Sequence, residues 1–426
     1  MRKTKTSIGH HTFTMSRRIT GEELNRGFST PWTVSPGKLV AASLLKDVSE
    51  YKQETEEIDI LIPIEKSSAW RPAKKTVRHD GKWEFEHFGI WKIVYTSEHL
   101  KGLNWILRYN TYSSDFCEYT IEARINSKVF VGTNDFITAS DDKHLLFVEK
   151  RFNIEAKKIS PILGQFYQYM PKRIDFCINF DLKELSIQCT PEQMMYLIKK
   201  SDYPSHFKEL QYYDKKSYRY KAPDKNTHYL KSGSVNINCY YKHPQLMKQF
   251  PSCPDIEDAQ HVIRFEVQCL YSKTYQMKKQ AQERAQKERE LHYATHRNFY
   301  DDDSAENMIY KRLDTDPLKI IRSMLSDVTA ETIINKYFNQ MIKPGDYHTL
   351  ATAIKMVEDA NIHPVVEHDI IQTLESINRI GIVKTRALIQ PQAMPSFYRT
   401  LGYLAKMGIN PVTIPKSFKV KHFRTF

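Results

Sequence analysis

Two segments of the chain place an arginine and an acidic residue two positions apart within runs of β-forming residues. These are Arg173 with Asp175 and Arg264 with Glu266, and a third β-rich run holds Glu122. Side chains alternate between the two faces of a strand, so residues at i and i+2 point to the same face. Two such strands would create an acidic face edged with guanidinium groups.

Neighbouring carboxylates repel one another unless a positive charge lies between them, and their hard oxygen atoms suit Mg²⁺ or Mn²⁺. We therefore expect Glu122, Asp175 and Glu266 to hold one of these divalent cations. For each Arg–acid pair taken alone, a cross-strand salt bridge on a solvated face is the alternative. Asp59, on an earlier β-rich run, is either a further metal ligand or a structural residue.

A tyrosine pair followed by two basic residues ends another β-rich run, as Tyr240-Tyr241-Lys242-His243. A phenolate beside a metal can attack a phosphodiester in line, which leaves a phosphotyrosyl bond and a free 3′-hydroxyl. Because the pKa of an unperturbed phenol is about 10, the site must favour the phenolate, and Lys242 or the metal could do so.

The stretch 203–250 is basic, with nine lysines and arginines against three acidic residues. Its lysines could contact phosphates while its tyrosines stack on unpaired bases. The alternative is an ordinary polar loop whose tyrosines are half-buried. The tyrosines in question are Tyr212, Tyr213, Tyr218, Tyr220 and Tyr229.

The elements that must position these residues are predicted as short strands separated by polar turns. Thr190 and Pro191 begin a predicted helix that runs to Lys200. Strands interleaved with a few helices over residues 58–271 predict an α+β domain on a mainly antiparallel sheet. The predicted strands are Ile58–Ile64, Trp91–Tyr95, Trp105–Tyr109, Cys117–Ile125, Arg173–Phe180, Val235–Tyr241 and Val262–Leu270.

The remaining segments differ in composition from this domain. Residues 1–57 are mixed and basic without a sustained period, which predicts an N-terminal extension. Lys273–Arg297 contains no glycine or proline and predicts a long solvated helix within a connector over residues 272–304. Amphipathic runs over residues 305–426 predict an all-helical C-terminal domain. There, 372–391 and 395–407 are either a helix-turn-helix with Arg386 and Arg399 near DNA, or plain packing helices.

Composition narrows the class of protein. The chain has 426 residues, a net charge of +13 and 41% hydrophobic residues, which describes a folded protein that favours a polyanionic partner. No stretch is apolar enough to cross a membrane and no hydrophobic signal core is present, so we expect a cytoplasmic protein. The six cysteines form no CxxC pair, and we expect buried thiols rather than a zinc ribbon.

Seven motifs in order give the chain a family resemblance. Between about Ile58 and Pro415 it resembles the gene II/X family of phage and plasmid rolling-circle replication initiators. The motifs are Ile58-Asp59-Ile60-Leu61, Glu122 with Lys128 and Gly132-Thr133-Asn134-Asp135, Arg173-Ile174-Asp175, Cys239-Tyr240-Tyr241-Lys242-His243, Arg264-Phe265-Glu266, Phe397-Tyr398-Arg399, and Leu404-Ala405-Lys406-Met407-Gly408-Ile409.

The resemblance implies a site-specific, metal-dependent DNA nickase and strand-transferase, whose product 3′-end primes synthesis at a supercoiled origin. It places Tyr240 as the nucleophile, with Tyr241 as its rival, and Glu122, Asp175 and Glu266 at the metal. Arg173 and Arg264 would orient these carboxylates or hold a DNA phosphate. Further DNA contacts are expected from Lys128, Lys231 and His243.

Two departures shape these expectations. The chain has no His-hydrophobic-His motif, since His10 and His11 are adjacent and precede the β-rich region, so carboxylates must replace imidazoles as ligands. It also has no phosphate-binding loop, so a host helicase would be needed for unwinding. The resemblance implies origin DNA and a host DNA polymerase as the other partners. The alternatives are a conjugative relaxase or transposition nickase with the same chemistry, and a non-catalytic origin-binding regulator.

Overall fold

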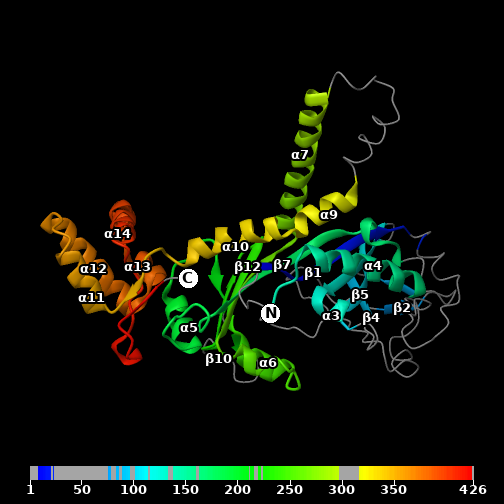
Figure 1. Ribbon diagram of the computed structural model, residues 1–426. Coiled ribbons are helices and arrows are strands. Elements are labelled where there is room, and N and C mark those ends of the chain that lie inside the picture. Colours follow the sequence, from blue (N-terminus) through cyan, green and yellow to red (C-terminus); the bar gives the residue numbers. More distant parts are fainter. Residues whose placement is uncertain are drawn as a thin grey trace.

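The computed structural model describes most of the chain in thirteen stretches (Figure 1). For some residues in helices or strands it describes the backbone but not the side chains. These residues lie within 75–95, 106–119, 159, 212–221 and 292–296. The predicted strand Ile58–Ile64 and Asp59 lie outside the described residues. The stretches are 8–20, 23, 75–77, 83–85, 89–95, 101–113, 116–132, 138–159, 163–210, 212–214, 219–221, 224–296 and 316–424.

A nine-stranded sheet forms the centre of the molecule, and every neighbouring pair of its strands is antiparallel. This confirms the predicted mainly antiparallel sheet and all the predicted strands that are described. In spatial order the strands are β4 (Gly89–Tyr95), β5 (Leu103–Ser113), β6 (Phe116–Asn126), β1 (Ile8–Ile19), β7 (Met170–Asp181), β13 (Val262–Cys269), β12 (Val235–Tyr241), β11 (Thr227–Lys231) and β8 (Lys208–Glu209).

The strand β1 corrects the expectation of an N-terminal extension. Ile8–Ile19 lies in the middle of the sheet, hydrogen-bonded to β6 on one side and β7 on the other. Its Phe13 and Met15 are buried, whereas Thr12 and Thr14, which alternate with them, are partly exposed. This alternation is the signal of a strand with one apolar face, and it was present in the sequence.

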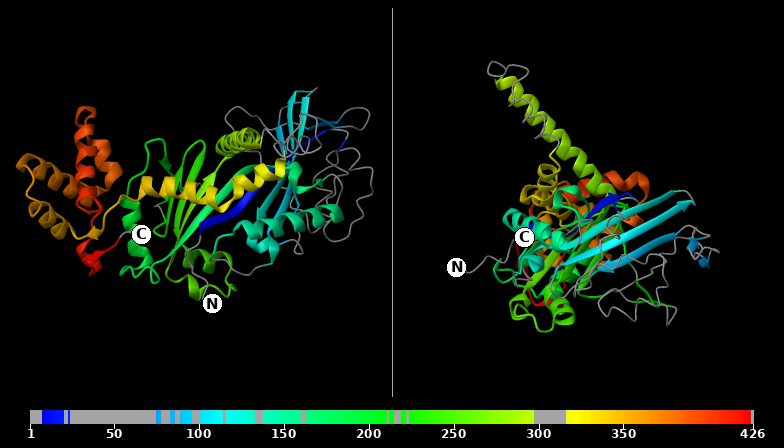
Figure 2. Two further views of the ribbon diagram at one scale, coloured as in Figure 1. Left: turned by 45° about the horizontal axis from the view of Figure 1, so that its top comes forward. Right: turned by 90° about the vertical axis from the view of Figure 1, so that its right-hand side faces the viewer.

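One face of the sheet is apolar and is covered by helices. The helix α10 (Asp327–Met341) runs across it, and the Phe338 ring packs on Phe180 of β7 and Phe265 of β13, with ring centroids 5.2 and 5.4 Å away (Figures 1 and 2). The helices α4 (Asp142–Ile159) and α9 (Pro317–Leu325) cover the part formed by β1, β6 and β7. There Trp105 of β5 packs on Phe152, with ring centroids 5.6 Å apart.

Shorter helices close the ends of the strands. The helix α3 (Ser127–Val131) directly follows β6, and α6 (Lys242–Gln249) directly follows β12. The helix α5 (Pro191–Lys200) confirms the predicted helix start, because the Thr190 side chain accepts a hydrogen bond from the Gln193 N–H. Two small hairpins flank the sheet, formed by β2 (Lys75–Val77) with β3 (Trp83–Phe85) and by β9 (Tyr212–Asp214) with β10 (Arg219–Lys221).

The predicted long charged helix is present as α7 (Tyr271–His296), which projects away from the sheet (Figure 1). It is solvated on most sides, but Thr274, Met277, Ala281 and Ala285 form a buried strip. This strip faces β7 and α9, so the first part of the helix belongs to the core. None of the described helices is long and apolar enough to span a bilayer.

The C-terminal part differs from the expected all-helical domain in two respects. The helices α9 and α10 share the core of the sheet, and β14 (Tyr347–His348) pairs with β15 (His422–Phe423). The remaining helices have a small core of their own, to which Ala353, Ile370 and Leu404 contribute. These helices are α11 (Leu350–Glu358), α12 (Pro364–Ile380), α13 (Ile382–Leu388) and α14 (Met394–Lys406).

A buried ion-pair cluster fastens these helices to the sheet. Asp202, after α5, pairs with Lys343 at 3.0 Å and with Arg386 of α13, whose guanidinium also donates to the Tyr203 carbonyl at 2.7 Å. Arg386 is therefore used in packing within the molecule, which favours the alternative of plain packing helices. Gly381, at φ +85°, lies so close to Lys200 that an added Cβ would be 3.1 Å from its Cα and carbonyl oxygen.

We predict that Asp202→Asn destabilises the protein. Removing one charge from a buried ion pair leaves its partners unpaired, here Lys343 and Arg386, and the free energy of unfolding should fall by about 3 kcal/mol. Urea denaturation followed by circular dichroism measures this change. The exposed Asp359→Asn variant is the matched control, and equal stability of the two variants would contradict the role of the cluster.

Candidate active site

The second face of the sheet carries polar side chains from six neighbouring strands. Cross-strand register places Tyr240 of β12 opposite Arg264 of β13, and Arg264 opposite Asn179 of β7. The next row joins Asn238, Glu266 and Cys177 in the same way. Strand alternation therefore gathers on one face residues that are far apart in the sequence.

Tyr240 is buried within this face. The Arg264 guanidinium donates a hydrogen bond to its hydroxyl, and the Arg264 Nε donates to the Asn179 Oδ1 at 2.7 Å. Arg264 itself is fully buried. Burial raises the pKa of the Tyr240 phenol above its usual value, and Arg264 opposes this shift. The phenol is therefore neutral at pH 7 and needs a base to become a nucleophile.

Lys242 lies beside the Tyr240 ring and has a lowered pKa. It begins α6, and its Nζ lies 5.8 Å from the centroid of the Tyr240 ring and donates to the Gln245 Oε1 at 2.7 Å. Burial, followed by the charge of Arg264, lowers the pKa of Lys242 well below its usual range. A neutral amine can accept a proton, which an ammonium cannot.

Tyr241 points to the opposite face. Its hydroxyl donates to the Gln260 carbonyl at 2.9 Å, and its ring stacks on His243 with centroids 5.9 Å apart. Tyr241 therefore does not share the surroundings of Tyr240. His243, predicted as a DNA contact, lies with Tyr241 rather than beside Tyr240.

Two of the three predicted metal-binding carboxylates come together. Asp175 accepts from the Arg173 Nε at 2.7 Å and from its Nη2 at 2.9 Å, and Glu266 accepts from the Gln268 Nε2 at 2.7 Å. Burial and then the negative charge of Glu266 raise the pKa of Asp175 to about 7, against the opposing effect of Arg173. Mutual repulsion of this kind is relieved by a bound cation.

The third predicted ligand, Glu122, accepts a hydrogen bond from the Lys172 ammonium. Within the described ranges, no three histidine, cysteine, aspartate or glutamate side chains are close enough to hold a metal ion. The expected three-carboxylate set is thus not assembled. The donors that fit a divalent cation are Asp175 and Glu266, each of whose oxygens keeps a second lone pair.

His11 of β1 was not among the predicted site residues. The pairing of β1 with β7 shifts register between His10 and Thr12, so His11 is the extra residue of a β-bulge. Burial, then the charges of Arg264 and Lys242, lower the pKa of His11 well below its usual value. The sequence shows two adjacent histidines beside an alternating run, but it does not show where they lie in the sheet.

The other predicted DNA contacts occupy different positions. Arg173 is partly exposed and holds Asp175. Lys128 of α3 is buried; burial raises the pKa of the nearby Cys177 thiol, and the charge of Lys128 is one of the weaker effects that oppose this shift. Lys231 is exposed at the end of β11, with its Nζ 5.9 Å from the Tyr229 ring. Tyr229 donates to the Gln268 Oε1 at 3.0 Å. The side chains of the other predicted stacking tyrosines lie outside the described residues.

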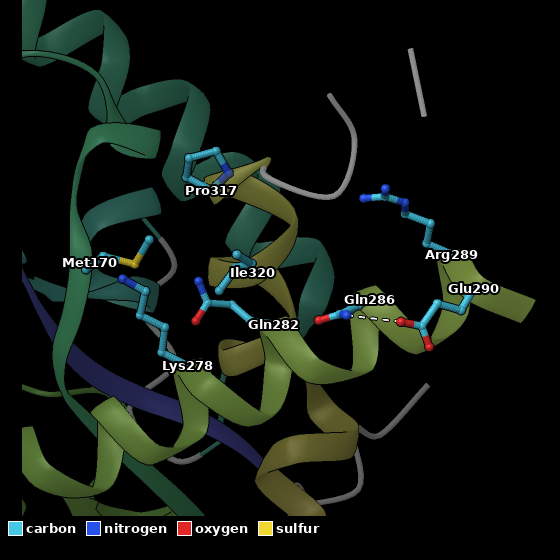
Figure 3. Close-up of a pocket in the computed structure, with 8 residues that line it drawn as sticks. All are labelled: Met170, Lys278, Gln282, Gln286, Arg289, Glu290, Pro317 and Ile320. Carbon is cyan, nitrogen blue, oxygen red and sulfur yellow. Dashed lines mark hydrogen bonds between the residues drawn. The ribbon is translucent and has the colours of Figure 1, made fainter. Parts of the chain in front are cut away.

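A separate cavity of about 510 Å³ lies between α7, α9 and the start of β7 (Figure 3). It contains none of the predicted site residues. Its lining is Met170, Lys278, Gln282, Gln286, Arg289, Glu290, Pro317 and Ile320.

Comparisons with known proteins do not assign the chain to a family. No protein-family model matches it, and no curated protein or solved structure matches it at a significant level.

We predict that ionised Asp175 costs stability. Its pKa is about 7 in the folded protein against 3.8 for a free side chain, so the folded state binds the proton more tightly. The free energy of unfolding should therefore fall as pH rises from about 4 to 7, by up to about 4 kcal/mol. Asp175→Asn should flatten this fall in urea titrations with a chelator present.

The exposed Asp369→Asn variant should keep the pH dependence of the unchanged protein. If Asp175→Asn were equally destabilising at pH 5 and pH 8, the carboxyl would not be the group responsible.

Proposed function

We propose that the protein is a rolling-circle replication initiator, which nicks one strand of origin DNA with Tyr240 and later rejoins the displaced strand. The observation that carries the proposal is the contact of the Tyr240 phenol with buried Arg264, beside the low-pKa amine of Lys242. The motifs that resemble the gene II/X family support the same assignment, since Tyr240, Asp175 and Glu266 lie within them.

The proposed reaction is a transesterification in which atoms balance. The Tyr240 Oη attacks the phosphorus, its proton passes to the Lys242 amine, and the bond from phosphorus to the 3′-oxygen breaks. The Lys242 ammonium then returns the proton to the departing 3′-oxygen. Arg264 stabilises the added negative charge by hydrogen bonding. Attack of a new 3′-hydroxyl on the phosphotyrosine reverses these steps and seals the strand.

A divalent cation at Asp175 and Glu266 would polarise the phosphate oxygens, and Mg²⁺ or Mn²⁺ suits this pair of oxygen donors. Lys128 and Arg173 are further candidates to meet DNA phosphates near this face. A host helicase and DNA polymerase would supply unwinding and synthesis, and cytoplasmic location follows from such partners.

We predict that Tyr240→Phe abolishes nicking of a supercoiled plasmid that carries the DNA flanking the gene, in the presence of Mg²⁺. Removing the hydroxyl removes the nucleophile, so both the open circle and the protein-linked 5′-end should be lost. Gel electrophoresis after protease treatment, and labelling of the 5′-linked protein, measure the two products.

Two variants refine this test. Tyr241→Phe should retain nicking, because its hydroxyl contacts the Gln260 carbonyl on the other face. Lys242→Gln should lower the nicking rate by about 10²-fold or more through loss of the base. Nicking that survives Tyr240→Phe but is lost in Tyr241→Phe would reverse the assignment of the nucleophile. Wild-type DNA binding without any nicking would instead favour the non-catalytic regulator.

We predict that metal binding depends on two carboxylates and not on three. Asp175→Asn and Glu266→Gln should each weaken Mn²⁺ binding by tenfold or more, because the two carboxylates repel each other. Glu122→Gln should leave it within twofold, because no group of three possible ligands is found among the described residues. Electron paramagnetic resonance of free Mn²⁺ measures the affinity without need of activity. An equal loss of Mn²⁺ affinity in all three variants would support the three-carboxylate site instead.

A further inference from the structure

The positive charge of the chain is concentrated at its C-terminal end. Residues 376–426 contain nine lysines and arginines and neither aspartate nor glutamate, whereas the whole chain has a net charge of +13. This segment begins in α12 and includes α13 and α14 (Figure 1). Its charge is complementary to a polyanion, and duplex DNA carries about one negative charge per 1.7 Å of its axis.

The helix α14 presents one continuous exposed strip. Phe397, Thr400 and Leu404 are buried against the other helices. On the opposite side Tyr398, Arg399, Gly402 and Lys406 are exposed. These four positions share a face because residues three, four and seven or eight apart align along a helix. Figures 1 and 2 place α14 among the helices at the end of the molecule remote from β2, β4 and β5.

Gly402 in the middle of this strip is not explained by packing within the molecule. A Cβ added there would meet no atom within 4 Å. Glycine is the least favourable residue after proline in a helix interior, so its presence lowers the stability of α14. What glycine does provide is bare backbone between two cationic side chains, where another surface can come close to the helix axis.

We propose that the exposed strip of α14, formed by Tyr398, Arg399, Gly402 and Lys406, is a docking surface for double-stranded DNA. Arg399 and Lys406 would contact phosphates on either side, and Gly402 would let the wall of the groove approach the helix. A helix of 13 residues is about 20 Å long and fits a major groove about 12 Å wide.

The position of this surface relative to the sheet is fixed. The ion pair of Arg386 with Asp202 and the close approach of Gly381 to Lys200 join α13 to the end of α5, directly before α14 in the chain. Duplex DNA held on α14 would therefore be held at a constant distance from Tyr240. The inference shares DNA as partner with the proposed function, but it does not depend on cleavage by Tyr240.

The test uses the full chain and fluorescence anisotropy with a labelled 30-base-pair duplex of mixed sequence, over a series of salt concentrations. Gly402→Gln should keep or raise the melting temperature, because glutamine is the better helix former, and should weaken duplex binding at least tenfold. Arg399→Ala combined with Lys406→Ala should reduce the slope of log affinity against log salt by about 2.

The matched control is Lys287→Ala combined with Lys355→Ala, which removes the same charge from exposed positions on α7 and α11. It should leave the salt slope unchanged. Unchanged duplex affinity in Gly402→Gln, or an equal loss of affinity in the control, would overturn the proposal. So would variants that bind a single strand of the same length more weakly but bind the duplex as before. Loss of nicking in Tyr240→Phe with intact duplex binding would separate the two proposals.

Discussion

The buried guanidinium of Arg264 is the interaction on which the polar face depends. A buried charge must be hydrogen-bonded and paired, or the fold loses several kcal/mol. From its place on β13, Arg264 hydrogen-bonds Tyr240 on β12 and Asn179 on β7 and feels the negative charge of Glu266. The apolar face has no such demand, because α10 simply covers it. The apolar face therefore packs the sheet against its helices, and the polar face positions the ionisable side chains.

The same burial sets the protonation of these groups. It raises the pKa of the Tyr240 phenol and lowers that of the Lys242 ammonium, so it favours the uncharged form of each group. Burial and the nearby Glu266 also raise the pKa of Asp175. Such opposed shifts within one face are expected where a proton is to move and where a cation is to bind, and they come at a cost in stability.

The C-terminal helices add a second surface at a fixed position. Asp202 is the residue that connects the two parts, because its carboxylate holds Lys343 and Arg386 at once. Through it the basic segment after residue 375 is attached to the end of α5. In the proposed function, the helical part would bind duplex DNA and the polar face of the sheet would act on a phosphodiester.

The sequence alone determined the strands and helices whose periodicity is strong, such as β7, β12, β13, the Thr190-capped α5 and most of α7, and it brought Tyr240, Asp175 and Glu266 into consideration. Their local patterns carry this information because strand alternation and helix caps are short-range. Only the tertiary structure decided that β1 lies in the middle of the sheet with His11 on its bulge. It also decided that Glu122 pairs with Lys172 and that Arg386 pairs with Asp202. Each of these depends on pairing between segments far apart in the chain, which no local pattern of residues specifies.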